Sequence, residues 1–201
     1  MKSIVLLFSC LLLLLSTQSN GQEKLTKNIK VPNITTTDAV GQKIKLQTLL
    51  KDNKKVLICF FRPVWCPICN QRTHELIERY DELKKKGIEV LAIYPSKQET
   101  MAQYVKDAKI PFPVISDPDE LLYKQYAVER SMKKVLAAIE RDDIKKVIIE
   151  GTTLYAGKTY PKNNEKYDAI INADFLVGAK RNLEVAYYGD YIGDHYSLDE
   201  L

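Results

Sequence analysis

A pair of cysteines within Trp65-Cys66-Pro67-Ile68-Cys69 constrains this chain more than any other feature. The pair follows the apolar, β-branched residues 56–61 and precedes a helical pattern at about residues 70–86. A strand, a turn, a C-x-x-C motif and a helix together place one thiol at a helix N-terminus. Unpaired backbone N–H groups and the helix dipole favour an anion there and lower a thiol pKa from ~8.5 to roughly 3.5–7.5. The sequence therefore predicts redox chemistry at Cys66 and Cys69.

The first residues have the pattern of a secretory signal peptide. Lys2 is followed by the almost wholly apolar residues 4–15 and the small, polar residues 16–21, so we expect cleavage after Gly21. The apolar run is shorter than the ~20 residues that span a bilayer, so we expect no stable membrane anchor. Cys10 lies inside the run rather than at its end, which argues against lipidation. The chain is expected to act outside the cytoplasm, in a periplasm or as a secreted protein.

Residues 22–201 are of the size of one domain. The net charge of +4 is small and dispersed, which argues against nucleic acid as a partner. Only Cys59, Cys66 and Cys69 remain after cleavage, too few for a disulfide scaffold in an exported protein. Cys59 lies in the apolar run and is expected to be a core residue.

The order of the expected elements predicts an α/β fold. Thr35 to Leu46 is typical of a β-hairpin that turns at Gly41. Strands are expected at residues 56–61, 88–94 and 112–115, helices at 70–86, 99–108 and 119–126, and a final antiparallel hairpin at 170–177 and 183–188. Alternating strands and helices indicate a central mixed sheet with helices on both faces. Residues 129–168, irregularly helical and then polar, are expected to be an insertion before the last hairpin.

Several blocks of the chain resemble one family. They are Phe60-Phe61-Arg62 leading into the cysteine motif, Pro111-Phe112-Pro113-Val114-Ile115-Ser116-Asp117-Pro118, Ala173-Asp174-Phe175-Leu176-Val177, and Tyr188-Gly189-Asp190-Tyr191-Ile192-Gly193-Asp194-His195. Together with the element order, they resemble the thioredoxin-like fold and, within it, the peroxiredoxin-like AhpC/TSA (redoxin) family. The resemblance implies a thiol-based antioxidant or disulfide-exchange activity that needs no cofactor.

Two positions depart from the thioredoxin-like pattern. Asn172 stands where such proteins place a cis-proline facing the cysteines. A non-proline cis bond costs ~2.5–4 kcal/mol, so we expect a trans bond there and a polar contact from Asn172 to the sulfurs. Phe60 stands where many thioredoxins carry a buried carboxylate, six residues before the first cysteine, so proton transfer cannot use that group.

The resemblance leaves two assignments of the cysteines open. The thioredoxin pattern makes Cys66 the attacking thiol and Cys69 the resolving thiol, whereas the peroxiredoxin register makes Cys69 the peroxidatic residue. Anion stabilisation at a helix terminus falls off within the first turn, which favours Cys66 as the attacker.

Three neighbours of the pair are candidate site residues. Arg62 can hold a thiolate or a peroxide oxygen by charge-assisted hydrogen bonding. Trp65 is expected to shield the pair and to offer an apolar face to a substrate. Pro67 suits the first helical position and, with Asn172, completes the expected substrate-binding set.

Three functions fit these residues. The first is exchange with a protein dithiol or disulfide partner, and the second is reduction of hydrogen peroxide or organic hydroperoxides. Both require an external thiol reductant. The third is a Cu(I)-binding chaperone, since soft thiolates suit Cu(I). Only His74 and His195 are available as further ligands and are expected to be solvent-exposed or turn-stabilising, so we expect no metal site.

Overall fold

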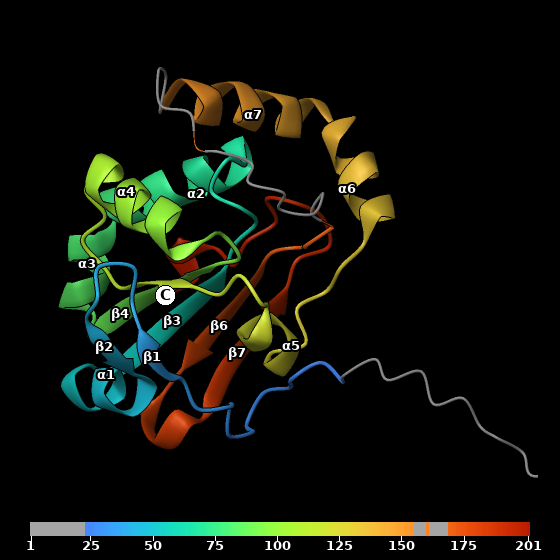
Figure 1. The fold of residues 1–201 in the computed structure, drawn as a ribbon. Coiled ribbons are helices and arrows are strands. Elements are labelled where there is room, and N and C mark those ends of the chain that lie inside the picture. The colour runs from blue at the N-terminus through green and yellow to red at the C-terminus, as the bar shows by residue number, and fades with distance from the viewer. Residues whose placement is uncertain (1–22, 155–159, 161–168) are drawn as a thin grey trace, which may run out of the picture.

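The core of the fold is a five-stranded mixed sheet. It is described here in a computed structural model that covers residues 23–154, 160 and 169–201 (Figure 1). The expected signal peptide, residues 1–21, lies outside the described residues. In spatial order the strands are β5 (Val114–Ser116), β4 (Ile88–Tyr94), β3 (Lys55–Phe60), β6 (Ala173–Val177) and β7 (Leu183–Tyr188). β3 pairs parallel with β4 and antiparallel with β6, which confirms the predicted mixed sheet.

Both faces of the sheet are covered, as predicted. Alternate residues of β3 and the position after it, Leu57, Cys59 and Phe61, point into one hydrophobic layer, whereas Val56 and Ile58 point into the other. A strand buried on both faces needs apolar side chains at every position, which explains the unbroken apolar run in the sequence. The first layer holds α2 (Pro67–Glu78), α3 (Tyr80–Lys85), α4 (Gln98–Ala108), α6 (Met132–Ile139) and α7 (Asp142–Leu154), and the second holds α1 (Leu46–Asp52) and α5 (Leu121–Gln125).

The predicted N-terminal hairpin is confirmed. β1 (Thr35–Thr37) and β2 (Lys43–Lys45) are antiparallel and the chain turns at Gly41, whose φ is 89°. Asp38 stabilises the turn because its carboxylate accepts hydrogen bonds from the N–H groups of Val40 (3.0 Å) and Gln42 (2.8 Å).

Three parts of the helical structure differ from the prediction. Helix α1, which directly follows β2, was not expected, although Leu46, Leu49 and Leu50 have helical spacing and pack on the second layer. The helix expected at 70–86 begins at Pro67 and is divided at Arg79 into α2 and α3. The helix expected at 119–126 is shortened to α5, because the carboxylate of Asp117 accepts the N–H groups at the start of that helix.

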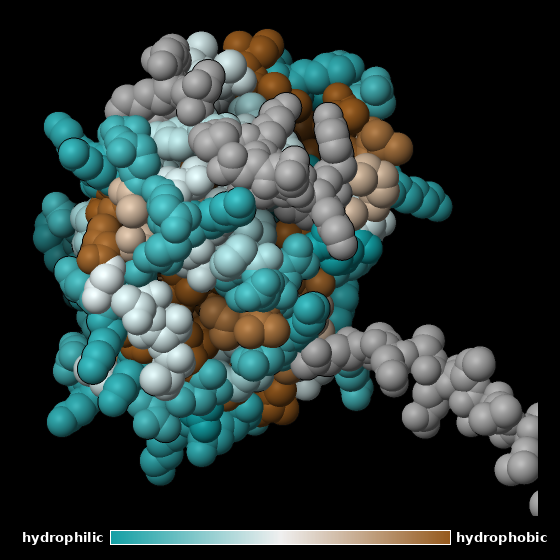
Figure 2. All heavy atoms as spheres, viewed as in Figure 1, coloured by the Kyte–Doolittle hydropathy of each residue, from teal (hydrophilic) through white to brown (hydrophobic). Residues whose placement is uncertain are grey.

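Helices α6 and α7 occupy the region expected to be an insertion before the last hairpin. The later part of that region, residues 155–159 and 161–168, lies outside the described residues. Figure 1 shows α7 above α2. On the outer side of the two helices Met132, Leu136 and Ile149 are exposed, and Figure 2 shows hydrophobic spheres at that edge of the molecule. Within the described residues, no helix has both the length and the apolar character needed to cross a bilayer.

Candidate active site

Cys66 occupies the N-cap position of α2, and Pro67 is the first helical residue. The N–H group of Cys66 donates to the carbonyl oxygen of Pro63 (2.9 Å), which closes a tight turn between β3 and α2. The carbonyl oxygen of Cys66 accepts the N–H of Asn70 (3.1 Å), the first bond of the helix ladder. The sequence motif therefore folds into the strand, turn and helix that it predicted.

The cysteines are more enclosed than the motif alone indicates. Cys66 is 4% exposed and Cys69 is fully buried, so the two residues differ little in exposure. Trp65 is partly buried and packs against the same hydrophobic layer, in agreement with a shielding role. Each of the three described cysteines is a free thiol, and Cys59 is a buried core residue, as predicted.

The surroundings of Cys66 favour its thiolate. A hydrogen bond from the Cys69 thiol contributes most and, against the opposing effect of burial, the pKa of Cys66 is lowered to about 6. The positive charge of Arg62 and the backbone N–H groups of Cys69 and Ile68 act in the same direction. At neutral pH Cys66 is therefore mainly ionised and is the more nucleophilic of the two thiols.

Cys69 has the opposite character. Burial raises its pKa well above the ordinary thiol value, and the hydrogen bond to Cys66 and the negative charge on that sulfur raise it further. The backbone N–H of Arg62 donates to Sγ of Cys69 over 3.3 Å. Cys69 therefore keeps its proton at neutral pH, beside the ionised thiol of Cys66.

Arg62 lies near both cysteines. It is only 5% exposed, and its positive charge lowers the pKa values of both Cys66 and Cys69. A buried guanidinium next to a sulfur anion can also hold a second negative atom, such as an oxygen or sulfur of a bound substrate.

Asn172 reaches the second cysteine of the pair, Cys69. Its side-chain amide donates to the carbonyl oxygen of Phe60 (3.3 Å) and lies 4.0 Å from Sγ of Cys69. Its Oδ1 accepts the N–H of Gly193 (3.0 Å). All peptide bonds of the described residues are trans, as expected at this asparagine. Asn172 therefore links the end of β3, the C-terminal loop and Cys69.

A buried ionic cluster lies beside the site and was not predicted. The carboxylate of Asp174, in β6, accepts hydrogen bonds from His195 Nδ1 (2.9 Å) and from the N–H of Tyr196 (2.8 Å). A guanidinium nitrogen of Arg72, in α2, lies 3.9 Å from the same oxygen. Burial alone raises the pKa of Asp174, but His195, Arg72 and the N–H of Tyr196 outweigh it and lower this pKa below the usual range.

This cluster changes two expectations. His195 was expected to be solvent-exposed or turn-stabilising, but it bonds the buried Asp174, while Asp194 accepts the hydroxyl of Tyr187 (2.6 Å) and the N–H of Asp190 (2.8 Å). A buried carboxylate was thought to be missing, because Phe60 holds its usual place. β6 supplies one, since Asp174 is paired in register with Cys59 of β3. The signal in the sequence was a single acidic residue within an otherwise apolar strand.

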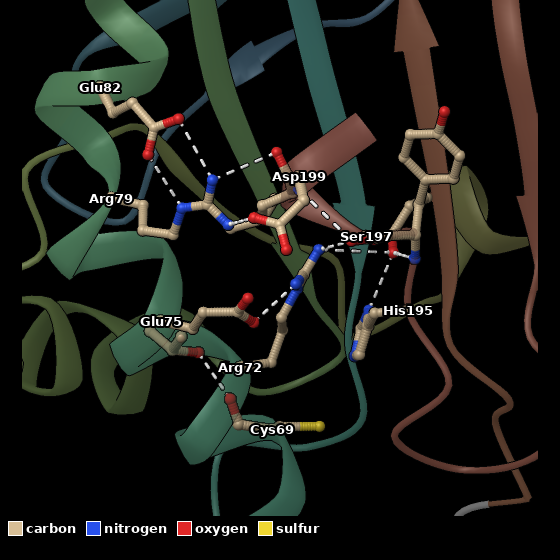
Figure 3. Close-up of polar contacts among 12 residues, drawn as sticks. Cys69, Arg72, Glu75, Arg79, Glu82, His195, Ser197 and Asp199 are labelled. Carbon is tan, nitrogen blue, oxygen red and sulfur yellow. Dashed lines mark hydrogen bonds and ion pairs between the residues drawn. The ribbon is translucent and has the colours of Figure 1, made fainter. Parts of the chain in front are cut away.

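Two arginines, Arg72 in α2 and Arg79 at its C-terminal end, bind the C-terminal tail. Arg72 donates to the carbonyl oxygen of Tyr196 (2.8 Å) and forms an ion pair with Glu75 (2.6 Å). Arg79 forms an ion pair with Asp199 (2.7 Å) and donates to the carbonyl oxygen of Leu198 (3.3 Å). Figure 3 shows both side chains extending from α2 and its C-terminal end toward the tail that carries His195.

The two histidines do not gather near the cysteine pair as metal ligands. Nε2 of His74 lies 3.3 Å from the carboxylate of Glu78 on the same helix, and His195 is occupied by Asp174. The described part of the chain contains no group of three or more His, Cys, Asp or Glu side chains arranged to hold one ion.

Comparisons with known proteins agree with this geometry. A family model described as "AhpC/TSA family" matches residues 28–185. A thiol-disulfide oxidoreductase ResA of Bacillus cereus is 29% identical over 132 residues, which cover 65% of this chain and 75% of ResA. Peroxiredoxin Bcp of Escherichia coli is 23% identical over 167 residues, covering 83% and 88%. The crystal structure of peroxidoxin BcpB from Mycobacterium tuberculosis shares the fold, with a TM-score of 0.62, 14% identity and coverage of 85% and 90%.

Proposed function

Because the chain belongs to the AhpC/TSA family, we propose that it is a thiol–disulfide oxidoreductase that acts through Cys66 and Cys69. The observation that carries this proposal is the opposite displacement of two adjacent thiol pKa values. Cys66 is ionised at neutral pH and Cys69, one turn inside the helix, keeps its proton. An attacking thiolate next to a protonated second thiol is what two-step disulfide exchange requires.

The reaction proceeds in two displacements. The Cys66 thiolate attacks one sulfur of a disulfide, the S–S bond breaks, and the departing thiolate takes up a proton. Cys69 then loses its proton to the second leaving sulfur and attacks Sγ of Cys66. The substrate leaves as two thiols, and Cys66 and Cys69 form a disulfide. Two electrons have passed to the substrate, so an external thiol reductant must restore the dithiol.

The compartment in which the protein acts belongs to the same proposal. The pattern of residues 1–21 supports export across a membrane and activity in a periplasm or outside the cell. The similarity to ResA, named as a thiol-disulfide oxidoreductase, supports disulfide exchange as the activity.

Peroxide reduction is the second candidate, and the burial of Arg62 beside the pair favours it. In this reaction the Cys66 thiolate attacks the O–O bond, the alcohol or water leaves with a proton, and Cys66 becomes a sulfenic acid. Cys69 condenses with it, releases water and forms the same disulfide. The similarity to peroxiredoxin Bcp supports this alternative.

One stopped-flow experiment separates the two candidates. The reduced protein is mixed with oxidised glutathione or with hydrogen peroxide and quenched at set times, and the loss of the mass of two hydrogen atoms marks closure of the Cys66–Cys69 disulfide. Disulfide exchange is supported if oxidised glutathione reacts faster than it does with N-acetylcysteine, and if Cys69→Ser stops at a mixed disulfide on Cys66. Acceleration by hydrogen peroxide alone assigns the peroxidase. No acceleration by either oxidant, or a mixed disulfide on Cys69 in Cys66→Ser, contradicts the proposal.

A further inference from the structure

Helix α7 touches the first turn of α2 through its backbone. A Cβ atom placed on Gly151 would lie 1.9 Å from the carbonyl oxygen of Pro67 and 2.6 Å from its carbonyl carbon. Any other residue would have to push the two segments apart, so glycine alone permits this contact. Pro67 adjoins Cys66, and α7 therefore packs on the turn of α2 that directly follows the cysteine.

The start of α7 also contacts the C-terminal loop that packs against the cysteine motif. Gly193, in the C-terminal loop, packs between Ile68 of the cysteine motif and Ile144 of α7. The guanidinium carbon of Arg141, just before α7, lies 4.0 Å from the ring centroid of Tyr191 in that loop. Cys66, at the N-terminal end of α2, is only 4% exposed, and Figure 1 shows α7 lying above α2.

Resting on the proposed function, we propose that α7 is a size filter for Cys66 and that Gly151 is the positioning residue that sets it. A low-molecular-weight disulfide needs only a narrow approach to Sγ. A disulfide on a folded protein brings a surface that collides with α7 before the sulfurs meet. The substrate class of the site is therefore the small-molecule disulfide, and large substrates react only with the fraction of molecules in which α7 has moved off Pro67.

Two maleimides of equal chemistry and different size test the filter. The reduced full chain is treated with N-ethylmaleimide or with a maleimide on a long polyethylene glycol chain, and mass spectrometry assigns the adduct to Cys66. The ratio of the large-reagent rate to the small-reagent rate is divided by the same ratio for N-acetylcysteine. We expect the result to lie about tenfold or more below one, since only the open fraction admits the polymer.

Variants of α7 provide the second arm. Gly151→Leu should move α7 off Pro67 and raise the normalised ratio toward one, whereas Thr152→Ala, on the exposed side of the same helix, should leave it unchanged. Arg141→Ala removes the contact with Tyr191 and should raise the ratio by a few-fold while the fold is kept, because Arg141 is a surface residue.

The outcomes are separable from those of the proposed function. A wild-type ratio near one overturns the filter, as does an unchanged ratio in both folded Gly151→Leu and Arg141→Ala. If circular dichroism shows that Gly151→Leu is unfolded, the wild-type ratio and Arg141→Ala decide. Failure of the proposed function has a different signature, because N-ethylmaleimide itself would then react no faster with Cys66 near pH 7 than with N-acetylcysteine.

Discussion

The backbone N–H of Arg62 donates a hydrogen bond of 3.3 Å to Sγ of Cys69, so the end of β3 is tied to the second cysteine rather than to the first. The Cys69 thiol in turn donates to Cys66, which is the largest favourable effect on the Cys66 thiolate. The side chain of Arg62 adds its positive charge from the same position. The end of the strand therefore bonds Cys69, and Cys69 in turn stabilises the thiolate of Cys66.

Removing the donor on Cys69 should raise the pKa of Cys66. Cys69→Ala leaves no S–H group to stabilise the thiolate, so the pH midpoint for alkylation of Cys66 by iodoacetamide should rise from about 6 toward the ordinary thiol value. Cys69→Ser keeps an O–H donor and is the matched control, with a midpoint closer to that of the wild type. Equal midpoints in the alanine and serine variants would contradict the role of this hydrogen bond.

Arg62→Met should slow Cys66 at acidic pH but not at alkaline pH. The substitution removes the charge and keeps much of the side-chain length, so the pKa of Cys66 rises. Each unit of increase lowers the thiolate fraction about tenfold at pH values below the pKa. Pseudo-first-order alkylation rates at pH 5 to 9 measure this. Arg62→Lys retains a positive charge and should lie between the two, while a rate deficit that persists at pH 9 would indicate a packing defect instead.

The cysteine motif and the strands could be read from the sequence because they depend on local rules. A C-x-x-C pair between an apolar strand and a helix places Cys66 at the N-cap whatever the rest of the chain does. The apolar run of β3 after Lys55 and the mostly apolar β4 can only be satisfied between two covered faces.

The packing of α7 on α2 and the ionic cluster around Asp174 could not be predicted in the same way, because they depend on contacts between distant segments. Gly151 meets Pro67, and Asp174 meets Arg72 and His195, only when the fold has formed. The sequence predicted only a turn-stabilising role for His195, yet in the folded protein its ring bonds the buried carboxylate of Asp174 from another segment.

Asn172→Ala should destabilise the protein and loosen the C-terminal loop. The carbonyl oxygen of Phe60 loses a donor in buried surroundings, and the N–H of Gly193 loses its acceptor in partly buried ones. An unsatisfied buried group costs about 1–3 kcal/mol, so urea unfolding should show a loss in that range. Asn172→Asp keeps an acceptor for Gly193 but sets a negative charge near Cys69. It should slow closure of the Cys66–Cys69 disulfide more than it lowers stability, and equal effects of the two variants on both measurements would contradict this reading.

Asp174→Asn should make the free energy of unfolding less dependent on acid pH. The pKa of Asp174 is lowered in the folded protein, so its contribution to stability is fully present above the unfolded-chain value of about 3.9 and is lost as the pH falls through the folded value. At pH 7 the variant should be less stable by about 3 kcal/mol, because Arg72 loses its buried counter-charge and His195 loses a charged hydrogen-bond acceptor. The difference between the two proteins should then shrink as the pH falls below about 4, since protonation removes the same charge from the wild type. Asp199→Asn, which weakens the exposed pair with Arg79, is the matched control and should cost less than about 1 kcal/mol. A stability difference that stays constant from pH 7 to pH 2 would contradict the electrostatic role of Asp174.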